Sequence, residues 1–263
     1  MISPLTPSSC AAQQAGRSVQ PAARHSRGGP VGKHSLLVGV QGAKPLGLLF
    51  LFLLFLLPSP AGAESSFTAR ARYVPDGDTL VLTDGRVVRL VGIDAPEVAH
   101  EERPTQLGAE EARAELARLV RDRMLTIRPV APYADQYGRV LALVSLPDGT
   151  TAQAGMLRAG LAFVFYFVDQ DEQFFRELLP LQRQAMQAGR GFWPRLTAGA
   201  VPGGGLVGNV KSRRFGTARC AVAGHIAKHN RRLFGSVRAA FWHGFSPYRE
   251  CGWWPAAGAG PGF

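Results

Sequence analysis

Acidic side chains gather at the ends of two apolar segments that lie close together in the sequence. Asp76 and Asp78 belong to "DGDTL", Asp94 and Glu97 belong to "DAPE", and Arg89 lies between them in "VVRLVGI". Carboxylate and carbonyl oxygens are the ligands that hard cations such as Ca²⁺ take. A guanidinium offers paired, permanently charged donors to phosphate oxygens. The combination predicts a divalent cation beside a phosphate. The alternative is that these acidic residues only form turns, in which Asp is common.

A purely structural role explains some of these positions better than others. Asp76 precedes Gly77, and because Asp-Gly is a typical turn dipeptide, we expect Asp76 to be a turn residue. Asp78 opens an apolar strand, where threonine or valine would be more favourable. Asp94 ends an apolar strand, and Glu97 taken alone is a solvated surface acid. Asp78 and Asp94 are therefore the stronger candidates for a cation site, provided that their strands pair.

The spacing between the arginine and the second acidic stretch needs an irregular backbone. Arg89 and Asp94 are five residues apart, and an odd separation places two side chains on opposite faces of a regular strand. Gly92 lies between them and permits either a bulge or a strand end before Asp94. In such a site the carbonyl of Ala95 is a candidate third oxygen ligand, and Glu97 is a candidate base that activates water.

The remainder of residues 64–196 has the pattern of an α+β domain. Apolar and β-branched residues predict strands over 67–93, with a hairpin turn at Asp84-Gly85, and again in "MLTIRPV" and "RVLALVSL". Arg139, in "DQYGRV", starts the last of these strands and is a second candidate for phosphate contact. Helical spacing predicts three helices, over 107–123, over 151–159 up to Gly160, and over 171–188, where Pro180 is expected to kink or restart the helix.

The front of the chain predicts an exported protein. Residues 46–57, "LGLLFLFLLFLL", follow Lys33 and Lys44 and run into an A-x-A site at 61–63, so we expect a signal peptide cleaved after Ala63. The apolar run is short for a transmembrane helix, which is the alternative interpretation. Residues 1–44 contain no Asp or Glu and are expected to be disordered. We therefore predict a secreted or periplasmic monomer without stable membrane insertion after cleavage.

The basic charge belongs to the tail of the chain. The formal net charge is +11, yet residues 64–196 carry 16 basic and 18 acidic side chains, whereas residues 197–263 carry 9 basic and 1 acidic. Composition divides this tail into a Gly/Pro linker over 197–209, a small basic module over 210–254 and a low-complexity, disordered end over 255–263. The charge predicts a polyanionic partner, such as nucleic acid or an anionic surface.

Several motifs together resemble those of the staphylococcal nuclease-like (thermonuclease) family. "DGDTL", "VVRLVGIDAPE", "LGAEEA", "DQYGRVLALV", "LRAGLA" and "GRGFW" occur in the family's order, between Phe67 and Leu196, which is about half of the chain. The resemblance implies an α+β fold, namely an OB-type five-stranded antiparallel β-barrel with about three helices. It also implies a Ca²⁺-dependent phosphodiesterase that acts on DNA and RNA.

The resemblance also assigns roles to individual residues. It implies metal ligation by Asp78, Asp94 and the Ala95 carbonyl, phosphate contact by Arg89 and Arg139, and a general-base role for Glu97. The chain departs from the family pattern at two positions, with Gln136 in place of a lysine and Val168 in place of a second tyrosine. Tyr137 and Tyr166 are kept as candidate nucleic-acid contacts. The departures bear on substrate affinity more than on the chemistry.

The basic module faintly resembles small accessory modules that bind a metal with several cysteines. Only Cys220 and Cys251 are present here, and in an exported chain two cysteines favour a disulfide. The alternative is a zinc site completed by His225 and His229, which are one helical turn apart. Seven basic residues are expected to form a phosphate-binding face, or else a solvated run of charge: Lys211, Arg213, Arg214, Arg219, Lys228, Arg231 and Arg232.

The sequence therefore predicts a secreted calcium-dependent nuclease that hydrolyses DNA or RNA by metal-assisted attack of water. One rival is an OB-type nucleic-acid-binding protein of the cell envelope that has lost catalysis. It predicts erosion of the acidic ligands, and these are all present. A second rival is an envelope protein whose basic module binds anionic surface polymers, with the acids serving only as turn residues.

Overall fold

The computed structural model describes residues 65–99, 104–167, 172–198, 205–252 and 254–258. The predicted leader and signal peptide (1–63) and Val168 lie outside these ranges. Within the described ranges, every helix is too short or too polar to cross a bilayer.

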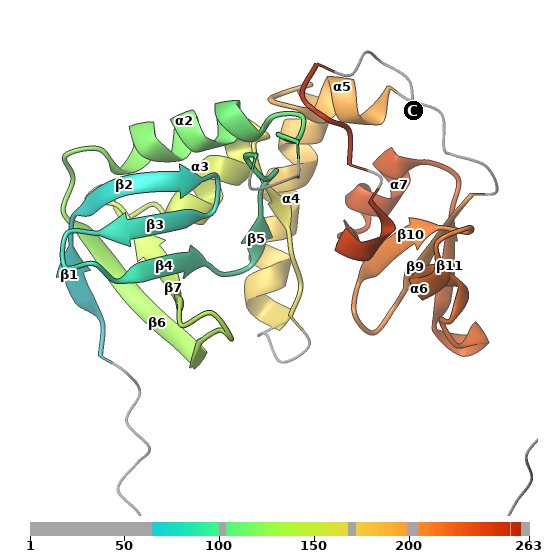
Figure 1. Cartoon of the computed structure of the whole chain (residues 1–263), viewed down its shortest axis with the longest axis horizontal. Helices are drawn as coiled ribbons and strands as arrows, with labels where there is room; N and C mark the ends of the chain where they lie inside the picture. Colours follow the sequence, from blue (N-terminus) through green and yellow to red (C-terminus); the bar gives the residue numbers. More distant parts are fainter. Residues whose placement is uncertain (1–64, 100–103, 168–171, 199–204, 253, 259–263) are drawn as a thin grey trace, which may run out of the picture. The chain divides into compact units, whose positions relative to one another are not determined.

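One curled, six-stranded sheet forms the frame of the nuclease-like part (Figure 1). Its strand order is β1-β6-β7-β4-β3-β2, and the strands are β1 (Phe67–Ala69), β2 (Ala71–Asp76), β3 (Thr79–Leu82), β4 (Val87–Leu90), β6 (Leu125–Ala134) and β7 (Val140–Ser145). The two edge strands, β1 and β2, are consecutive in the chain and only Arg70 separates them. The sheet is therefore curled, so that its first and last strands are joined directly in the chain.

The prediction of five antiparallel strands was wrong in two respects. The sheet has six strands, and β4 pairs with β7 in parallel, whereas the other neighbours are antiparallel. Between β4 and β7 the chain leaves the sheet, returns as β6, and then reverses direction, so that β7 runs antiparallel to β6 and parallel to β4. The described residues also hold six α-helices instead of about three, because the chain after residue 187 contains three further short helices.

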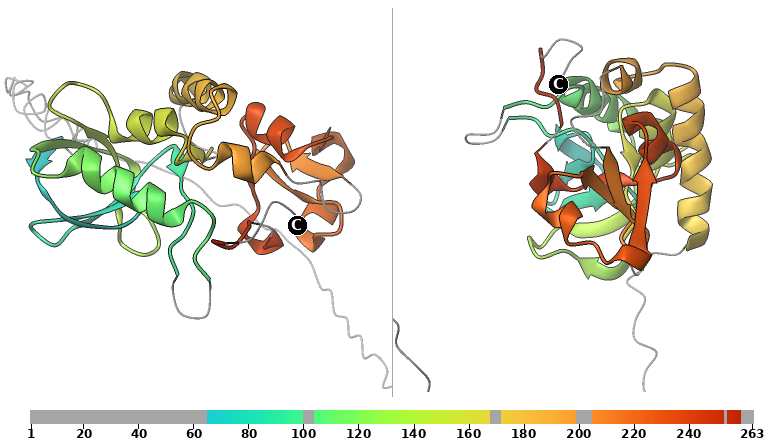
Figure 2. Two further views of the ribbon diagram at one scale, coloured as in Figure 1. Left: turned by 90° about the horizontal axis from the view of Figure 1, so that it is seen from above. Right: turned by 90° about the vertical axis from the view of Figure 1, so that its right-hand side faces the viewer.

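Three helices cover the sheet and lie next to one another, with α3 between α2 and α4 (Figure 2). They are α2 (Ala109–Val120), α3 (Ala152–Ala159) and α4 (Glu172–Gln187), and each is a little shorter than predicted. Thr151 caps α3 by accepting a hydrogen bond from the amide of Ala154, and Gly160 ends it at φ 70°. Pro180 lies inside α4, which continues through it as one helix instead of restarting.

A small two-stranded sheet, β5 (Ile93–Asp94) with β8 (Phe163–Val164), carries the second acidic stretch away from β4. The turn before it contains Gly92 at φ 79°, a backbone conformation that favours glycine. Asp94 therefore lies past the end of β4, and the odd spacing between Arg89 and Asp94 does not separate them. This is one of the two arrangements that the sequence left open.

The C-terminal region forms a four-stranded sheet in the order β11-β9-β10-β12. Its elements are β9 (Leu206–Asn209), β10 (Arg214–Thr217), α6 (Ala221–Gly224), η2 (Lys228–Asn230), β11 (Arg231–Phe234), α7 (Val237–Trp242), β12 (Ser246–Pro247) and η3 (Arg249–Cys251). Cys220 and Cys251 form a disulfide, with their Cα atoms 5.5 Å apart, so these thiols are not zinc ligands in this structure. His225 instead contacts the carbonyl of Ala221 through its Nδ1.

Two predicted boundaries in this region were wrong. Residues 206–209 were assigned to the linker, but they form β9, which pairs with both β10 and β11. Residues 255–257 were expected to be disordered, but they form a bridge with residues 105–107, where the amide of Leu107 donates to the carbonyl of Pro255 over 2.8 Å. In both cases backbone pairing with another segment outweighs a composition that is rich in Gly, Ala and Pro.

The module shares a hydrophobic core with the nuclease-like part. Phe241 of α7 is fully buried, and its ring packs against Phe163 of β8 and Trp193 of α5 (Trp193–Thr197), with ring centroids 5.3 and 5.0 Å apart. The buried amide of Gln182 in α4 accepts from the amide of Val164 and donates to the carbonyl of Phe241 over 2.6 Å. The two parts are thus joined by a common core as well as by a linker.

Replacing Phe241 by alanine tests this shared core. We expect Phe241→Ala to lower the free energy of unfolding by about 3–5 kcal/mol, because it leaves a cavity between the two parts. A single transition, shifted as a whole, is expected in chemical denaturation followed by circular dichroism. The control is Leu233→Ala, since Leu233 lies in the same module but is 76% exposed. Two separate transitions, of which only one moves, would contradict the shared core.

Gly77 allows the turn before Asp78 to approach α2 closely. A Cβ at this position would lie 2.6 Å from the Cβ of Ala112, in α2, and 2.7 Å from that of Ala95, whose amide is held by Asp78. We expect Gly77→Ala to cost about 1–3 kcal/mol of stability through overpacking. Thermal unfolding checks this, with Gly235→Ala as the control because no atom lies within 4 Å of a Cβ there. Equal stability of the two variants would refute the close-packing argument.

Candidate active site

Two buried carboxylates converge on one arginine. The Nη2 atom of Arg89 lies 2.9 Å from Oδ2 of Asp78 and 2.7 Å from Oδ1 of Asp94. All three residues are 4–5% exposed. The other guanidinium nitrogen, Nη1, donates to the backbone carbonyls of Leu90 and Ile93 over 2.6 and 2.9 Å. Arg89 therefore ties both acidic stretches to the strand between them.

The surrounding backbone fixes these side chains. Asp78 lies in the turn between β2 and β3, and its carbonyl accepts from the amide of Leu90. The carboxylate of Asp78 accepts from the amide of Ala95 over 2.9 Å and from the hydroxyl of Thr79 over 3.0 Å. Thr79 in turn pairs with Arg89 across β3 and β4. The turn, the strand pair and β5 thus bring Asp78, Arg89 and Asp94 together.

Asp76 has the turn role that its sequence indicates. Its Oδ1 accepts from the amide of Asp78 over 3.1 Å, two residues along the chain. This bond closes the turn that presents Asp78 to Arg89, so Asp76 shapes the site from outside the carboxylate pair.

The site has an excess of buried negative charge. Burial raises the pKa of the Asp78 carboxyl, and the charge of Arg89 acts in the opposite direction. Burial likewise raises the pKa of Asp94, against the charges of Arg249 and Arg89. The pKa of Glu97 is also raised, first by burial and then by the charge of Asp78. A positive ion or a proton is therefore stabilised among these carboxylates.

Glu97 lies at the exposed edge of the pair. Its backbone forms two hydrogen bonds with Gln106, in which the amide of Glu97 donates to Oε1 and its carbonyl accepts from the amide of Gln106. The side chain is 45% exposed, and its Oε1 lies 3.2 Å from Nη2 of Arg249. The same nitrogen of Arg249 donates to Oδ1 of Asp94 over 2.7 Å. The guanidinium of Arg249 therefore links Glu97 to the buried carboxylate of Asp94.

Arg249 was absent from the predicted site. It belongs to the C-terminal module and reaches the carboxylates across 155 residues of sequence. The only local signal is its place in "YREC", two residues before Cys251, and this says nothing of contact with Asp94. Only the packing of the module on the nuclease-like part reveals it.

The structure does not bring Arg139 into this cluster. Arg139 directly precedes β7, and its Nε donates to Oδ2 of Asp135 over 2.7 Å. Tyr137 belongs to the same turn, where its ring is 74% exposed and the Arg139 guanidinium lies 5.4 Å from its centroid. Arg139 and Tyr137 thus form a surface turn next to the strand that pairs with β4.

The basic residues of the module do not form one face. Arg213 pairs with Glu172 of α4 over 2.8 Å and lies 4.8 Å from the ring centroid of Tyr166. Arg214 donates to the carbonyl of Tyr166 over 2.8 Å. The remaining members of the predicted set are exposed, namely Lys211, Arg219, Lys228, Arg231 and Arg232. Arg213 and Arg214 therefore face the nuclease-like part, whereas the others face solvent.

The residues present suit a hard cation in their donor chemistry. Asp78 and Asp94 offer buried carboxylate oxygens, and burial raises the pKa of both carboxyl groups, which a bound cation would counter. Within the described ranges, no three or more His, Cys, Asp or Glu side chains are grouped as a ready-made metal site. Water would complete the coordination of a cation here, as is common for Ca²⁺ and Mg²⁺. The oxygen Oδ1 of Asp94 already accepts from Arg89 and Arg249.

Comparison with known proteins gives the same family as the motifs. The family model described as "Staphylococcal nuclease homologue" matches residues 87–195. An "Uncharacterized endonuclease" of Escherichia coli is 35% identical over 124 residues, which are 46% of this chain and 72% of that protein. A "Probable endonuclease LCL3" of Meyerozyma guilliermondii is 34% identical over 131 residues, which are 46% of this chain and 55% of that protein. The range that the family model matches contains Arg89, Asp94, Glu97 and Arg139. Because the family model matches and the Escherichia coli relative is 35% identical over 72% of its length, the chain belongs to the staphylococcal nuclease-like family.

Proposed function

We propose that this protein is a secreted, calcium-dependent nuclease that hydrolyses phosphodiester bonds of DNA, RNA or both. The observation that carries the proposal is the convergence of Asp78 and Asp94 on Arg89, with Glu97 linked to Asp94 through the guanidinium of Arg249. Relatives of the same family are named endonucleases, and the chain retains every acidic residue of the family motifs.

The cation site in this proposal consists of Asp78, Asp94 and the carbonyl of Ala95. Bound Ca²⁺ supplies positive charge that polarises the phosphoryl oxygens and favours ionisation of a water molecule. Arg89 keeps both carboxylates in place and offers its fixed positive charge to the phosphate. These residues counter the negative charge that otherwise repels an attacking nucleophile.

Glu97 acts as the general base in this proposal. Its carboxylate is partly exposed, so that water and substrate can reach it, and its raised pKa makes it a better proton acceptor than an ordinary glutamate. Arg139 contacts the substrate phosphate after exchanging its partner, Asp135, for a phosphate oxygen. Tyr137 lies next to it with a largely exposed ring, where a base can stack.

The rival is a catalytically inactive OB-type protein that only binds nucleic acid. A plasmid-cleavage assay on the purified protein separates the two. We expect conversion of supercoiled plasmid in Ca²⁺ and none in excess EGTA, because the carboxylates alone leave the phosphate charge unneutralised. Binding without cleavage under both conditions would support the rival instead.

Replacing Glu97 by glutamine tests the base. We expect Glu97→Gln to lower kcat by about 10²–10⁴-fold, because an amide cannot accept the proton of water, while Ca²⁺ binding measured by calorimetry is retained. Glu110→Gln is the matched control, since Glu110 is similarly exposed at 52% and also pairs with an arginine. A wild-type rate in Glu97→Gln would show that Glu97 is not the base.

Export of the protein is part of the proposal. It rests on the apolar run 46–57 followed by the A-x-A site at 61–63. In an oxidising compartment the disulfide between Cys220 and Cys251 is stable, which agrees with export. N-terminal sequencing of the protein recovered outside the cytoplasm is expected to begin at Glu64. Recovery of that protein with residues 1–45 still attached would contradict cleavage.

A further inference from the structure

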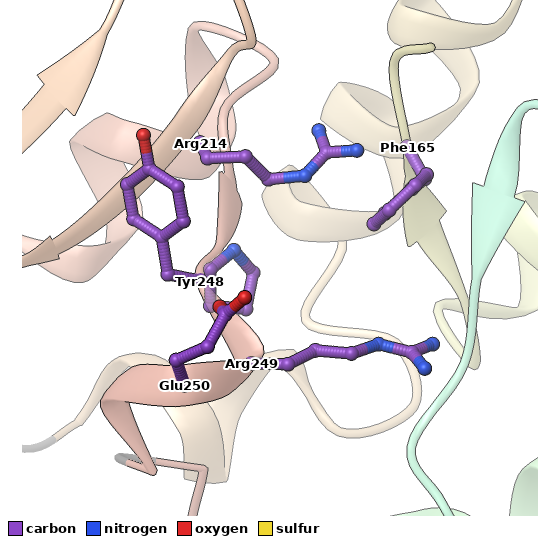
Figure 3. Close-up of a pocket in the computed structure, with 6 residues that line it drawn as sticks. Phe165, Arg214, Tyr248, Arg249 and Glu250 are labelled. Atoms are coloured by element: carbon purple, nitrogen blue, oxygen red, sulfur yellow. The ribbon is translucent and has the colours of Figure 1, made fainter. Parts of the chain in front are cut away.

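A pocket in the C-terminal module opens next to the carboxylates of the candidate active site. Its volume is about 240 Å³, and its lining residues are Phe165, Arg214, Pro247, Tyr248, Arg249 and Glu250 (Figure 3). Phe165 follows β8 of the nuclease-like part, and the other five belong to the module. We propose that this pocket is a nucleotide subsite, in which Arg214, Tyr248 and Arg249 hold one phosphate and the adjoining base of the nucleic acid strand beside the site of cleavage. The proposal rests on the proposed nuclease function and adds a substrate-binding role for the module.

Arg249 connects the pocket to the catalytic carboxylates. Its guanidinium extends from η3 toward the nuclease-like part (Figure 3) and contacts Asp94 over 2.7 Å and Glu97 over 3.2 Å. The side chain is nevertheless 58% exposed, so donors of its guanidinium remain accessible. A guanidinium has five N–H donors, which is enough to bind a phosphate while it stays near a carboxylate. A phosphate held by Arg249 therefore lies beside the predicted cation ligands and base.

Arg214 supplies a second positive charge, which makes no ion pair with any residue that the structure describes. Its guanidinium donates to the carbonyls of Ser212 and Tyr166 over 3.0 and 2.8 Å and lies 3.5 Å from the ring centroid of Phe165. Among the described residues, no carboxylate is within ion-pair distance of it. Burial lowers the pKa of Arg214 to about 10, so the group remains charged at neutral pH. The charges of Asp94 and Glu250 act on Arg214 only from beyond ion-pair distance, so its guanidinium can take a phosphate oxygen as a direct partner.

Tyr248 provides the aromatic surface for a base. It directly precedes Arg249 in the sequence, and its amide donates to the carbonyl of Phe215 over 2.8 Å, which fixes its backbone to β10. Aromatic rings bind bases of any sequence by stacking, as expected for a nuclease of broad specificity. The ring of Phe165 is already covered by Arg214, so Tyr248 is the ring available to a ligand.

The size and charge of the pocket select this kind of ligand. Small-molecule sites commonly exceed about 300 Å³, so the pocket is too small for a large ligand and suits one phosphate or one base of a longer strand. The lining holds two guanidiniums and the carboxylate of Glu250, and Asp94 and Glu97 contact Arg249 from the active-site side, so Arg214 is the positive charge that remains without an ion pair among the described residues. The surrounding loop is fixed by the disulfide, because Cys251 ends the same 3₁₀ helix that begins with Arg249. The subsite is thus built before the substrate arrives.

The test measures binding without turnover. A fluorescently labelled single-stranded DNA is titrated with the full chain in EDTA, and fluorescence anisotropy is recorded at several salt concentrations. Arg249→Gln is expected to weaken binding about tenfold and to lower the salt slope by about 0.7, the effect of losing one phosphate contact. Tyr248→Leu is expected to weaken binding while leaving the salt slope unchanged, because it removes a stacking surface and no charge.

Arg195→Gln is the matched control. Arg195 is 55% exposed and pairs with the exposed Glu111, so this variant removes the same charge from a similar surface outside the pocket. Its affinity is expected to stay within about twofold of the wild type. Wild-type or tighter binding by Arg249→Gln would overturn the proposal, and tighter binding would identify Arg249 as a plug of the site. If the wild type binds DNA through Arg249 but does not cleave it in Ca²⁺, the proposed nuclease function fails while the subsite stands.

Discussion

The guanidinium of Arg89 is the interaction on which the rest of the site depends. It is buried between Asp78 and Asp94, and it also donates to the carbonyls of Leu90 and Ile93. Two carboxylates that contact the same guanidinium nitrogen are close together, and their negative charges repel one another strongly in a buried environment. Arg89 offsets part of that repulsion and fixes the backbone on both sides of the turn at Gly92. A buried ion pair of this kind is a costly way to gain stability, which favours a functional reason for keeping it.

The second constraint is the core shared by the nuclease-like part and the module. Phe163, in β8, pairs with Asp94 through the backbone and packs against Phe241 of the module through its ring. The strand that positions a predicted metal ligand is therefore supported by side chains from the end of the chain. Gln182 strengthens this connection by bridging Val164 and Phe241 in the interior. An attached module that packs in this way contributes to the geometry of the active site as well as to binding.

Because of this packing, the basic residues of the tail do not all have the same role. The net charge of the tail predicts one polyanion-binding surface, but its arginines have different surroundings. Arg213 neutralises Glu172, Arg214 covers Phe165, and Arg249 meets Asp94 and Glu97. These three arginines lie against the nuclease-like part, where a substrate strand is cleaved in the proposed function. The exposed basic residues, such as Lys228 and Arg232, remain available for longer-range attraction of a polyanion.

The sequence by itself determined the local features of this protein. Hydrophobic spacing predicted α2, α3 and α4, turn chemistry predicted the role of Asp76, and the motifs predicted the family to which the chain belongs. These features depend on residues that are near one another in the chain, so a local pattern carries the information. The parallel pairing of β4 with β7, the pairing of residues 255–257 with 105–107 and the contact of Arg249 with Asp94 were decided by the tertiary structure alone. Each of them joins segments that are far apart in the sequence, and such contacts form because burial and backbone pairing are satisfied over the whole fold, which no local pattern records.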